Sequence, residues 1–264
     1  MFLVDVHAHL NHAWFKEDLP AVIERARVAG VKAIVLNGVN QATNEEVLAL
    51  AKQYDVLKPA LGLYPVDAVN VKIDSPDESG LKKEKVDVDA TLAFIEQHKN
   101  EIVAIGEVGL DYKWVTEPAL LKQMKEIFQR IIDLAEKIKK PLIVHSRKAE
   151  ADVLDMLESS NCKRVVMHSF GGRKSLMKRG AELGFSFSIP PVVKRLRHFE
   201  TVIDIVNINQ LLTETDAPYL SPVAGQRNEP AFVIESIKKI AEIKKFTVEE
   251  VANNVWLNYQ KLFT

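Results

Sequence analysis

The chain has 264 residues, of which 47% are hydrophobic and 27% are charged, and its net charge at pH 7 is −1. This composition is typical of a globular protein with a sizeable core, and no apolar run approaches the roughly 20 residues that a membrane span needs. The balanced charge excludes a protein that coats nucleic acid through an overall basic excess. The single cysteine, Cys162, excludes an internal disulfide. Because a lone cysteine suits a reducing compartment and the first residues show no signal-peptide pattern, we expect a cytoplasmic location.

In chain order, short apolar runs alternate with longer segments of helical periodicity. The predicted strands are 2–6, 33–36, 57–63, 102–106, 141–144, 164–167, 184–189 and 210–213. The predicted helices are 19–29, 44–54, 88–98, 118–138, 149–158, 174–183, 231–243 and 248–257. The helix over 118–138 is the clearest, because its apolar residues return at steps of three and four and Pro118 stands at its start.

The alternation of strands and helices predicts an α/β protein, specifically a single (β/α)8 TIM barrel in one domain over residues 1–264. No Gly/Ser-rich linker interrupts the chain, and the charged segment 70–86 is predicted to be a long surface loop. The alternative is a doubly wound open sheet. That fold would want a Gly-rich phosphate loop after the first strand, and the sequence has none there.

Six potential metal ligands follow the predicted strands, at the end of the barrel where active sites form. His7 and His9 follow the first strand. The fourth, fifth, sixth and eighth strands lead to the remaining candidates, which are Glu107, His145, His168 and Asp216. Any single histidine could simply satisfy a buried hydrogen bond. Six such residues at five strand ends are far harder to explain by chance, so the sequence predicts a metal site at the barrel mouth.

The stretch VDVHAHL places Asp5, His7 and His9 at alternate positions, and alternate residues of a strand project to the same side. Both imidazoles can therefore bind one metal ion, with Asp5 deeper in the barrel and orienting one of the rings. A catalytic site uses three or four protein ligands for each ion, so six candidates suit two ions.

We expect Glu107 to bridge two divalent ions roughly 3.5–4 Å apart. His7, His9 and Asp216 would hold one ion, and His145 and His168 would hold the other. Imidazole and carboxylate ligands suit zinc, manganese or iron and tolerate magnesium, so Mg, Mn and Zn all stay open. Such a site activates water for hydrolysis, and Asp216 is placed to act as the general base.

Six stretches of the chain, taken together and in order, resemble the TatD family of metal-dependent deoxyribonucleases in the amidohydrolase-like barrel superfamily. They are DVHAHL (5–10), LGLYP (61–65), AIGEVGLDY (104–112), PLIVHSRKA (141–149), VVMHSF (165–170) and TDAPYLSPVAGQRNEP (215–230). The resemblance implies the same six metal ligands and a 3′–5′ exonuclease or related phosphodiesterase activity on DNA ends that depends on a divalent metal. From the metal-site argument above, we expect Glu107 and Asp216 to be the catalytic residues. The segment 188–199 departs from the family pattern, as do Tyr64 and Ser169, where relatives commonly carry histidine and cysteine.

A nucleic-acid substrate agrees with an uneven distribution of charge. Between residues 163 and 198 the chain has nine basic residues: Lys163, Arg164, Arg173, Lys174, Lys178, Arg179, Lys194, Arg195 and Arg197. Candidate phosphate contacts are Arg147 and, less directly, Arg227. Tyr64, Tyr112 and Trp114 could stack on bases, although each could equally serve packing. Nothing indicates a membrane or an obligate protein partner.

Two other functions stay open at this point. One is an amidohydrolase-type enzyme that cleaves C–N or C–O bonds of small cyclic amides or lactones. Many such enzymes bridge two metals with a modified lysine, whereas the fourth strand here ends in Glu107 and Lys113 lies too far along the chain to replace it. The other is a binding protein without activity, against which the intact ligand set argues.

Overall fold

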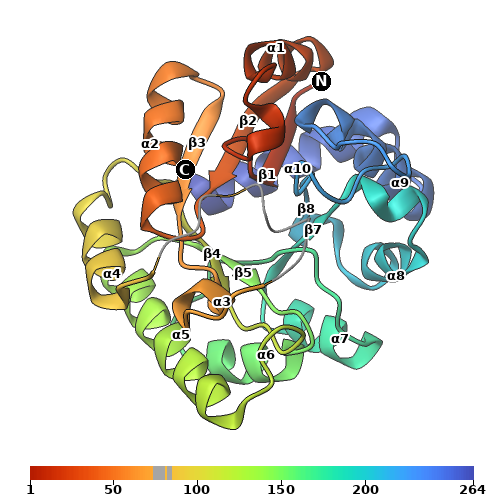
Figure 1. Ribbon diagram of the computed structural model, residues 1–264. Coiled ribbons are helices and arrows are strands. Elements are labelled where there is room, and N and C mark those ends of the chain that lie inside the picture. Colours follow the sequence, from red (N-terminus) through yellow and green to blue (C-terminus); the bar gives the residue numbers. More distant parts are fainter. Residues whose placement is uncertain (74–80, 82–84) are drawn as a thin grey trace.

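The structure, a computed structural model, describes residues 1–73, 81 and 85–264. Within them, eight parallel strands form one sheet in the order β1 to β8, and helices surround it (Figure 1). The strands are β1 (Leu3–Ala8), β2 (Val31–Asn37), β3 (Leu57–Leu61), β4 (Ala104–Gly109), β5 (Leu142–His145), β6 (Val165–Met167), β7 (Ser186–Ile189) and β8 (Leu211–Thr213). The predicted (β/α)8 barrel is therefore confirmed, and the doubly wound alternative is wrong. Most of the loop predicted over 70–86 lies outside the described residues.

The barrel closes where the segment after β8 meets the end of β1. The backbone N–H of Asp216 donates to the His7 carbonyl at 2.8 Å, and the N–H of His9 donates to the Ala217 carbonyl at 2.8 Å. Ala8 and Ala217 form a parallel bridge between these two hydrogen bonds. Closure therefore brings together two candidate ligand segments that lie more than two hundred residues apart in the sequence.

The longer helices begin and end at residues suited to those positions. Helix α2 starts with a capping box between Asn40 and Thr43, and α10 starts with one between Thr247 and Glu250. Helix α1 ends at Gly30, whose φ of 94° places it in the left-handed region that glycine tolerates. The helices are α1 (Leu19–Ala29), α2 (Gln41–Gln53), α3 (Pro65–Ala68), α4 (Val88–Gln97), α5 (Pro118–Ile138), α6 (Glu150–Glu158), α7 (Lys174–Glu182), α8 (Arg197–Ile205), α9 (Val233–Lys244) and α10 (Val248–Phe263). None of these described helices is both long enough and apolar enough to cross a membrane.

Several features differ from the predicted elements. Helices α3 and α8 lie outside the predicted helices, although the α8 residues Phe199, Val202 and Ile203 repeat at helical spacing and are buried, and α10 is longer than predicted. The predicted ends of the first and fourth strands are too early, because β1 extends through His7 and β4 extends through Glu107. In the sequence alone, a polar residue after a short apolar run indicates that the strand has ended. In a closed barrel a polar residue can continue the strand when its side chain points into the mouth.

The pairing of β1 with β2 and that of β4 with β5 are both irregular where these polar residues occur. The register between β1 and β2 shifts between Asp5 and Ala8, a stretch that contains His7. The register between β4 and β5 shifts between Ile105 and Val108, a stretch that contains Glu107. Irregularities of this kind change the direction of a side chain and are frequent next to active sites. The sheet is thus locally distorted at two of the six candidate ligands.

Candidate metal centre

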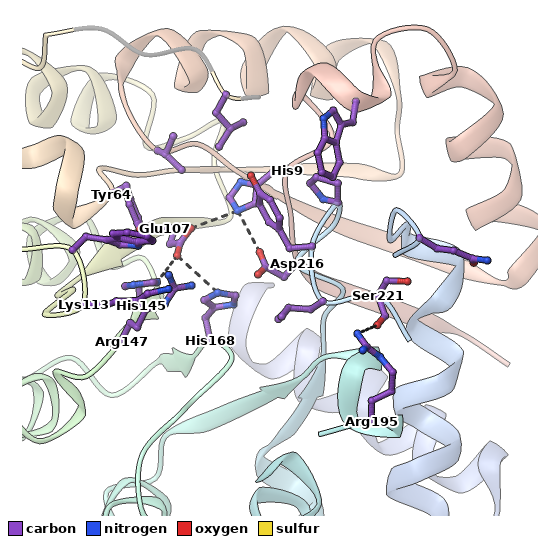
Figure 2. A pocket seen from close by; sticks show the side chains of 18 of the residues that line it. His9, Tyr64, Glu107, Lys113, His145, Arg147, His168, Arg195, Asp216 and Ser221 are labelled. Carbon is purple, nitrogen blue, oxygen red and sulfur yellow. Dashed lines mark hydrogen bonds and ion pairs between the residues drawn. The ribbon is translucent and has the colours of Figure 1, made fainter. Parts of the chain in front are cut away.

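The six side chains singled out in the sequence lie together at the carboxyl ends of the barrel strands, and Figure 2 shows five of them. His7 is in β1 and His9 directly follows it, while Glu107 is in β4 and His145 is the last residue of β5. His168 follows β6, and Asp216 comes after β8. The Nε2 atoms of His7 and His9 are only 3.1 Å apart. The six residues form three overlapping groups of metal-ligating type, which are His7, His9 and Glu107; Glu107, His145 and His168; and His7, His168 and Asp216.

Glu107 occupies the middle of this group and directs its two carboxylate oxygens to two different sets of nitrogen atoms. Its Oε2 atom is 3.5 Å from Nε2 of His7 and 3.5 Å from Nε2 of His9. Its Oε1 atom is 2.8 Å from Nδ1 of His145 and 3.8 Å from Nε2 of His168. Asp216 joins the first set, because its Oδ1 atom is 3.5 Å from Nε2 of both His7 and His9. The carboxylate of Glu107 therefore lies between two groups of donors.

In three of the four histidines, a ring nitrogen is also within hydrogen-bond distance of an oxygen atom outside the six candidate ligands. His9 Nδ1 is 3.0 Å from the Asn37 carbonyl. His145 Nε2 is 2.8 Å from Oδ2 of Asp111, and His168 Nδ1 is 2.7 Å from Oε2 of Glu214. Metal-binding histidines usually have such an outer partner, which fixes the ring and raises its basicity as a ligand.

These partners were not predicted from the sequence. Asp111 lies four residues after Glu107, and Glu214 lies two residues before Asp216. This proximity in the chain is the only signal that the sequence offers for either residue. Both carboxylates are completely buried. A carboxylate in such a place needs a cationic or hydrogen-bonding partner, and each has found one in a histidine.

The role expected for Asp5 is wrong. Its carboxylate does not touch an imidazole; it accepts hydrogen bonds from the backbone N–H and hydroxyl of Thr215 and from the backbone N–H of His7. Burial raises the pKa of Asp5 to about 8, and the hydrogen bonds from Thr215 oppose that rise. Asp5 therefore ties the segment after β8 to the middle of β1, which stabilises the barrel closure.

The electrostatics of the centre are dominated by its carboxylates. Burial alone would favour their neutral forms, yet the surrounding histidines hold the pKa of Glu107 and that of Asp216 below their usual values. Burial likewise opposes charge on His9, but hydrogen bonds to Asp216 and Glu107 raise its pKa to about 10. The Glu214 carboxylate raises the pKa of His168 to about 9 against the effect of burial. Protons on these histidines thus supply positive charge that the carboxylates require.

The donor set fits divalent metal ions. Burial and the charge of His168 lower the pKa of His7, which favours the neutral imidazole that a metal ion binds. Two imidazole nitrogens at 3.1 Å, both facing carboxylate oxygens, form a site that a shared cation would satisfy. Nitrogen and carboxylate donors in this proportion suit Zn²⁺ or Mn²⁺ and tolerate Mg²⁺.

A cavity of about 570 Å³ opens over the centre. Arg147 and Tyr64, two of the predicted substrate contacts, line it, as does Trp114. Tyr112 does not line this cavity; its hydroxyl donates to Asp152 at 2.6 Å. Arg227 does not line it either, because its guanidinium is paired with Asp18. The placement of these last two side chains gives no support to their predicted role.

Gly109 allows β4 and β5 to approach closely beside the centre. Its φ is 141°, and a Cβ atom there would lie 2.0 Å from the carbonyl oxygen of His145. We expect Gly109→Ala to lower the free energy of unfolding by about 2–4 kcal/mol, because the strand pair must separate and the backbone becomes strained. Urea denaturation would measure this. Gly184→Ala is the matched control, with a φ of 84° and no atom within 4 Å of the added carbon, and should cost only about 1 kcal/mol. Equal costs for the two variants would contradict the steric argument.

Comparisons with known proteins agree with one another. The family model described as TatD related DNase matches residues 4–264. The chain is 35% identical to YabD, an uncharacterized metal-dependent hydrolase of Bacillus subtilis, over 99% of this chain and 98% of that protein. It is 33% identical to the human deoxyribonuclease TATDN3, over 99% of this chain and 94% of that protein. The crystal structure of a TatD homologue from Escherichia coli superposes with a TM-score of 0.83 at 26% identity, covering 99% of this chain and 97% of that one. The chain therefore belongs to the TatD-related DNase family of metal-dependent hydrolases.

Proposed function

We propose that this hydrolase is a phosphodiesterase that uses two divalent metal ions to remove nucleotides from DNA ends, in the manner of a 3′–5′ exonuclease. The observation that carries the proposal is the position of Glu107, whose two buried oxygens face different histidines, His7 and His9 on one side and His145 and His168 on the other. A single ion would leave one of these groups unused. All the described strands belong to one barrel, so residues 1–264 are proposed to act as one catalytic domain.

The proposed ligands of the first ion are His7, His9 and Asp216, and those of the second are His145 and His168, with Glu107 shared. The ions would be Mg²⁺, Mn²⁺ or Zn²⁺. When bound, a pair of divalent ions supplies an acidified water and stabilises negative charge on the attacking and leaving oxygens.

Asp216 is the proposed general base. Its carboxylate stays ionised, because the histidines around it keep its pKa low despite burial. The side chain of Asp216 is 16% exposed, against 7% for that of Glu107, so Asp216 is the more exposed of the two carboxylates in the centre. The hydrogen bond from its backbone N–H to the His7 carbonyl fixes its position. Asp216 is thus held where it could accept a proton from an attacking water.

Arg147 is the proposed phosphate contact. It lines the cavity next to His145, and its only ion-pair partner among the described residues is Asp111, at the long distance of 4.0 Å. Asp111 already accepts a hydrogen bond at 2.8 Å from His145, a ligand candidate, so it neutralises the positive charge of Arg147 only weakly. A planar guanidinium with free N–H groups can bind a phosphate through two hydrogen bonds.

The test is incubation of the purified protein with single-stranded DNA and Mg²⁺ or Mn²⁺, with and without EDTA. We expect shortening from the 3′ end that EDTA abolishes, and phosphorothioate linkages at the 3′ end should block it while the same linkages at the 5′ end should not. An RNA of the same sequence shows whether the sugar matters. If Asp216→Asn cleaves as fast as the parent, the assigned general base is wrong. If DNA stays intact while cyclic amides or lactones are hydrolysed, the amidohydrolase alternative replaces this proposal.

A further inference from the structure

We infer that the side of the cavity formed by Trp14, Tyr219 and Arg195 is a subsite for a neighbouring nucleotide of the substrate, where Trp14 and Tyr219 stack on its base and Arg195 binds its phosphate. The three residues line the cavity but belong to neither group of metal ligands. The inference takes its substrate class from the proposed function. It adds that the enzyme recognises more of the nucleic acid than the bond that it cleaves.

The first observation is that an exposed tryptophan is held on a rigid backbone. Trp14 is 48% exposed and lies in the 3-10 helix Ala13–Phe15, which follows β1. Its N–H donates to Nδ1 of the buried His12 at 3.1 Å, and its carbonyl accepts a hydrogen bond from Arg227. Arg227 is itself fixed by Asp18. The backbone of Trp14 is thus held in place while about half of the residue stays open to solvent, where its ring can meet a flat ligand.

The second observation is that this ring belongs to an aromatic cluster continuous with the metal centre. The rings of Trp14 and Tyr219 have centroids 6.5 Å apart, and both contact His12, at 5.0 and 5.7 Å. The ring of Tyr219 also lies 6.5 Å from that of His9, a proposed ligand. Aromatic faces next to a catalytic site accept any base, because every base has a π-face. A nucleotide adjoining the scissile bond would therefore meet these rings.

The third observation concerns charge. Of the nine basic residues between 163 and 198, all of which the structure describes, Arg195 alone lines the cavity. Its Nη2 donates to the Ser221 carbonyl at 3.0 Å, and it forms no ion pair with any described residue. The adjacent Lys194 is different, because its ammonium is paired with Glu235 at 2.8 Å. The charge of Arg195 is therefore available to an anionic ligand.

The cations of the cavity lie on two sides of the metal centre. Figure 2 shows Lys113 and Arg147 beside His145 on one side, and Arg195 with Ser221 on the other, beyond Asp216. A chain of nucleotides, with a phosphate at every step, can place one phosphate at Arg147 and another at Arg195. The segment 188–199, which departs from the family pattern in the sequence, supplies Arg195.

The first experiment compares two substrates on each variant. One is a short oligothymidylate and the other is methyl p-nitrophenyl phosphate, a single phosphodiester with no neighbouring nucleotide. We expect Trp14→Ala and Arg195→Gln each to lower kcat/KM for the oligonucleotide about tenfold more than for the small diester, mainly through KM. Trp14→Phe should recover most of the loss.

The matched controls are Phe2→Ala and Lys194→Gln. Phe2 is 48% exposed, like Trp14, but precedes β1 at the opposite end of the strand, and Lys194 carries the same charge as its neighbour Arg195. Both controls should leave unchanged the ratio of kcat/KM for the oligonucleotide to kcat/KM for the small diester. Equal losses on both substrates for Trp14→Ala would show a merely structural role and overturn the inference.

The second experiment measures binding without cleavage, so that it does not depend on the proposed activity. Fluorescence anisotropy of a labelled oligothymidylate in EDTA should show weaker binding by about tenfold for Trp14→Ala. Arg195→Gln should reduce the slope of log K against log salt by about one. Binding that depends on both residues, without any metal-dependent cleavage, would uphold the subsite while the proposed function fails. If the Trp14 and Arg195 variants cleave DNA with unchanged binding and unchanged KM, the proposed function stands and the subsite is overturned.

Discussion

Replacing Glu107 by glutamine is expected to lower metal-dependent phosphodiester cleavage by at least about a thousandfold while the barrel stays folded. Glutamine keeps the shape of the side chain, but it has only one oxygen and no charge. It cannot face both groups of donors as Glu107 does through Oε1 and Oε2. The measurement is the initial rate of oligonucleotide cleavage at saturating Mn²⁺, together with a count of bound ions by atomic emission. We expect the variant to retain at most one ion.

Thermal unfolding of the same samples separates a lost site from a lost fold. Glu107 is buried among histidines whose protons it helps to stabilise, so its neutralisation should also destabilise the metal-free protein. Glu117→Gln is the control, because Glu117 is exposed at the start of α5 and should change neither rate nor ion count. A folded Glu107→Gln protein that cleaves DNA at the parent rate would remove the basis of the two-metal proposal.

Metal affinity is expected to rise steeply with pH, by up to about a hundredfold per pH unit between pH 6.5 and about 9. A metal ion binds a neutral imidazole, whereas the metal-free centre holds protons on His9 and His168, whose pKa values are raised from 6.5 to about 10 and about 9. Each proton that must leave adds a factor of about ten per pH unit to the apparent affinity. Calorimetric titration with Mn²⁺ in two buffers of different ionisation enthalpy counts the protons released.

The stability of the metal-free protein should change in the opposite sense. A histidine whose pKa is higher in the folded state than in the unfolded state stabilises the fold fully below pH 6.5, and this contribution disappears as the pH rises through the folded value. The difference in Tm between the Mn²⁺-loaded and the EDTA-treated protein should therefore widen from pH 6.5 to about 9. His98→Gln, at the end of α4 and outside both donor groups, is the control and should leave the slope unchanged. An affinity that is flat over this range would contradict the assigned ligands.

The strands and helices of the barrel could largely be predicted from the sequence, because the local pattern of apolar residues encodes them. A barrel strand such as β6 is apolar on both faces and stands out as a short run, and an outer helix such as α5 repeats its apolar residues every three or four positions. The candidate ligands could be predicted from their positions at the carboxyl ends of the strands, since all strands of a parallel barrel end at one mouth. This rule needs no knowledge of which strand neighbours which, and it holds for His7 and Asp216 alike.

What the sequence could not determine is which side chains meet across the barrel. Asp111 and Glu214 hold His145 and His168, while Asp5 holds Thr215 instead of a ring. The position of Arg227 after β8 predicts a phosphate contact, yet its guanidinium is paired with Asp18, 209 residues earlier in the chain. Arg195 lines the cavity instead.

The sequence by itself therefore determined the barrel and the positions that can carry its chemistry, because strand and helix periodicity are local properties of the chain. Only the tertiary structure decided the pairing of those positions. Closure of the sheet between the end of β1 and the segment after β8 sets where each side chain reaches, and a difference of a few ångströms decides whether a charge finds an internal partner or stays open to a ligand.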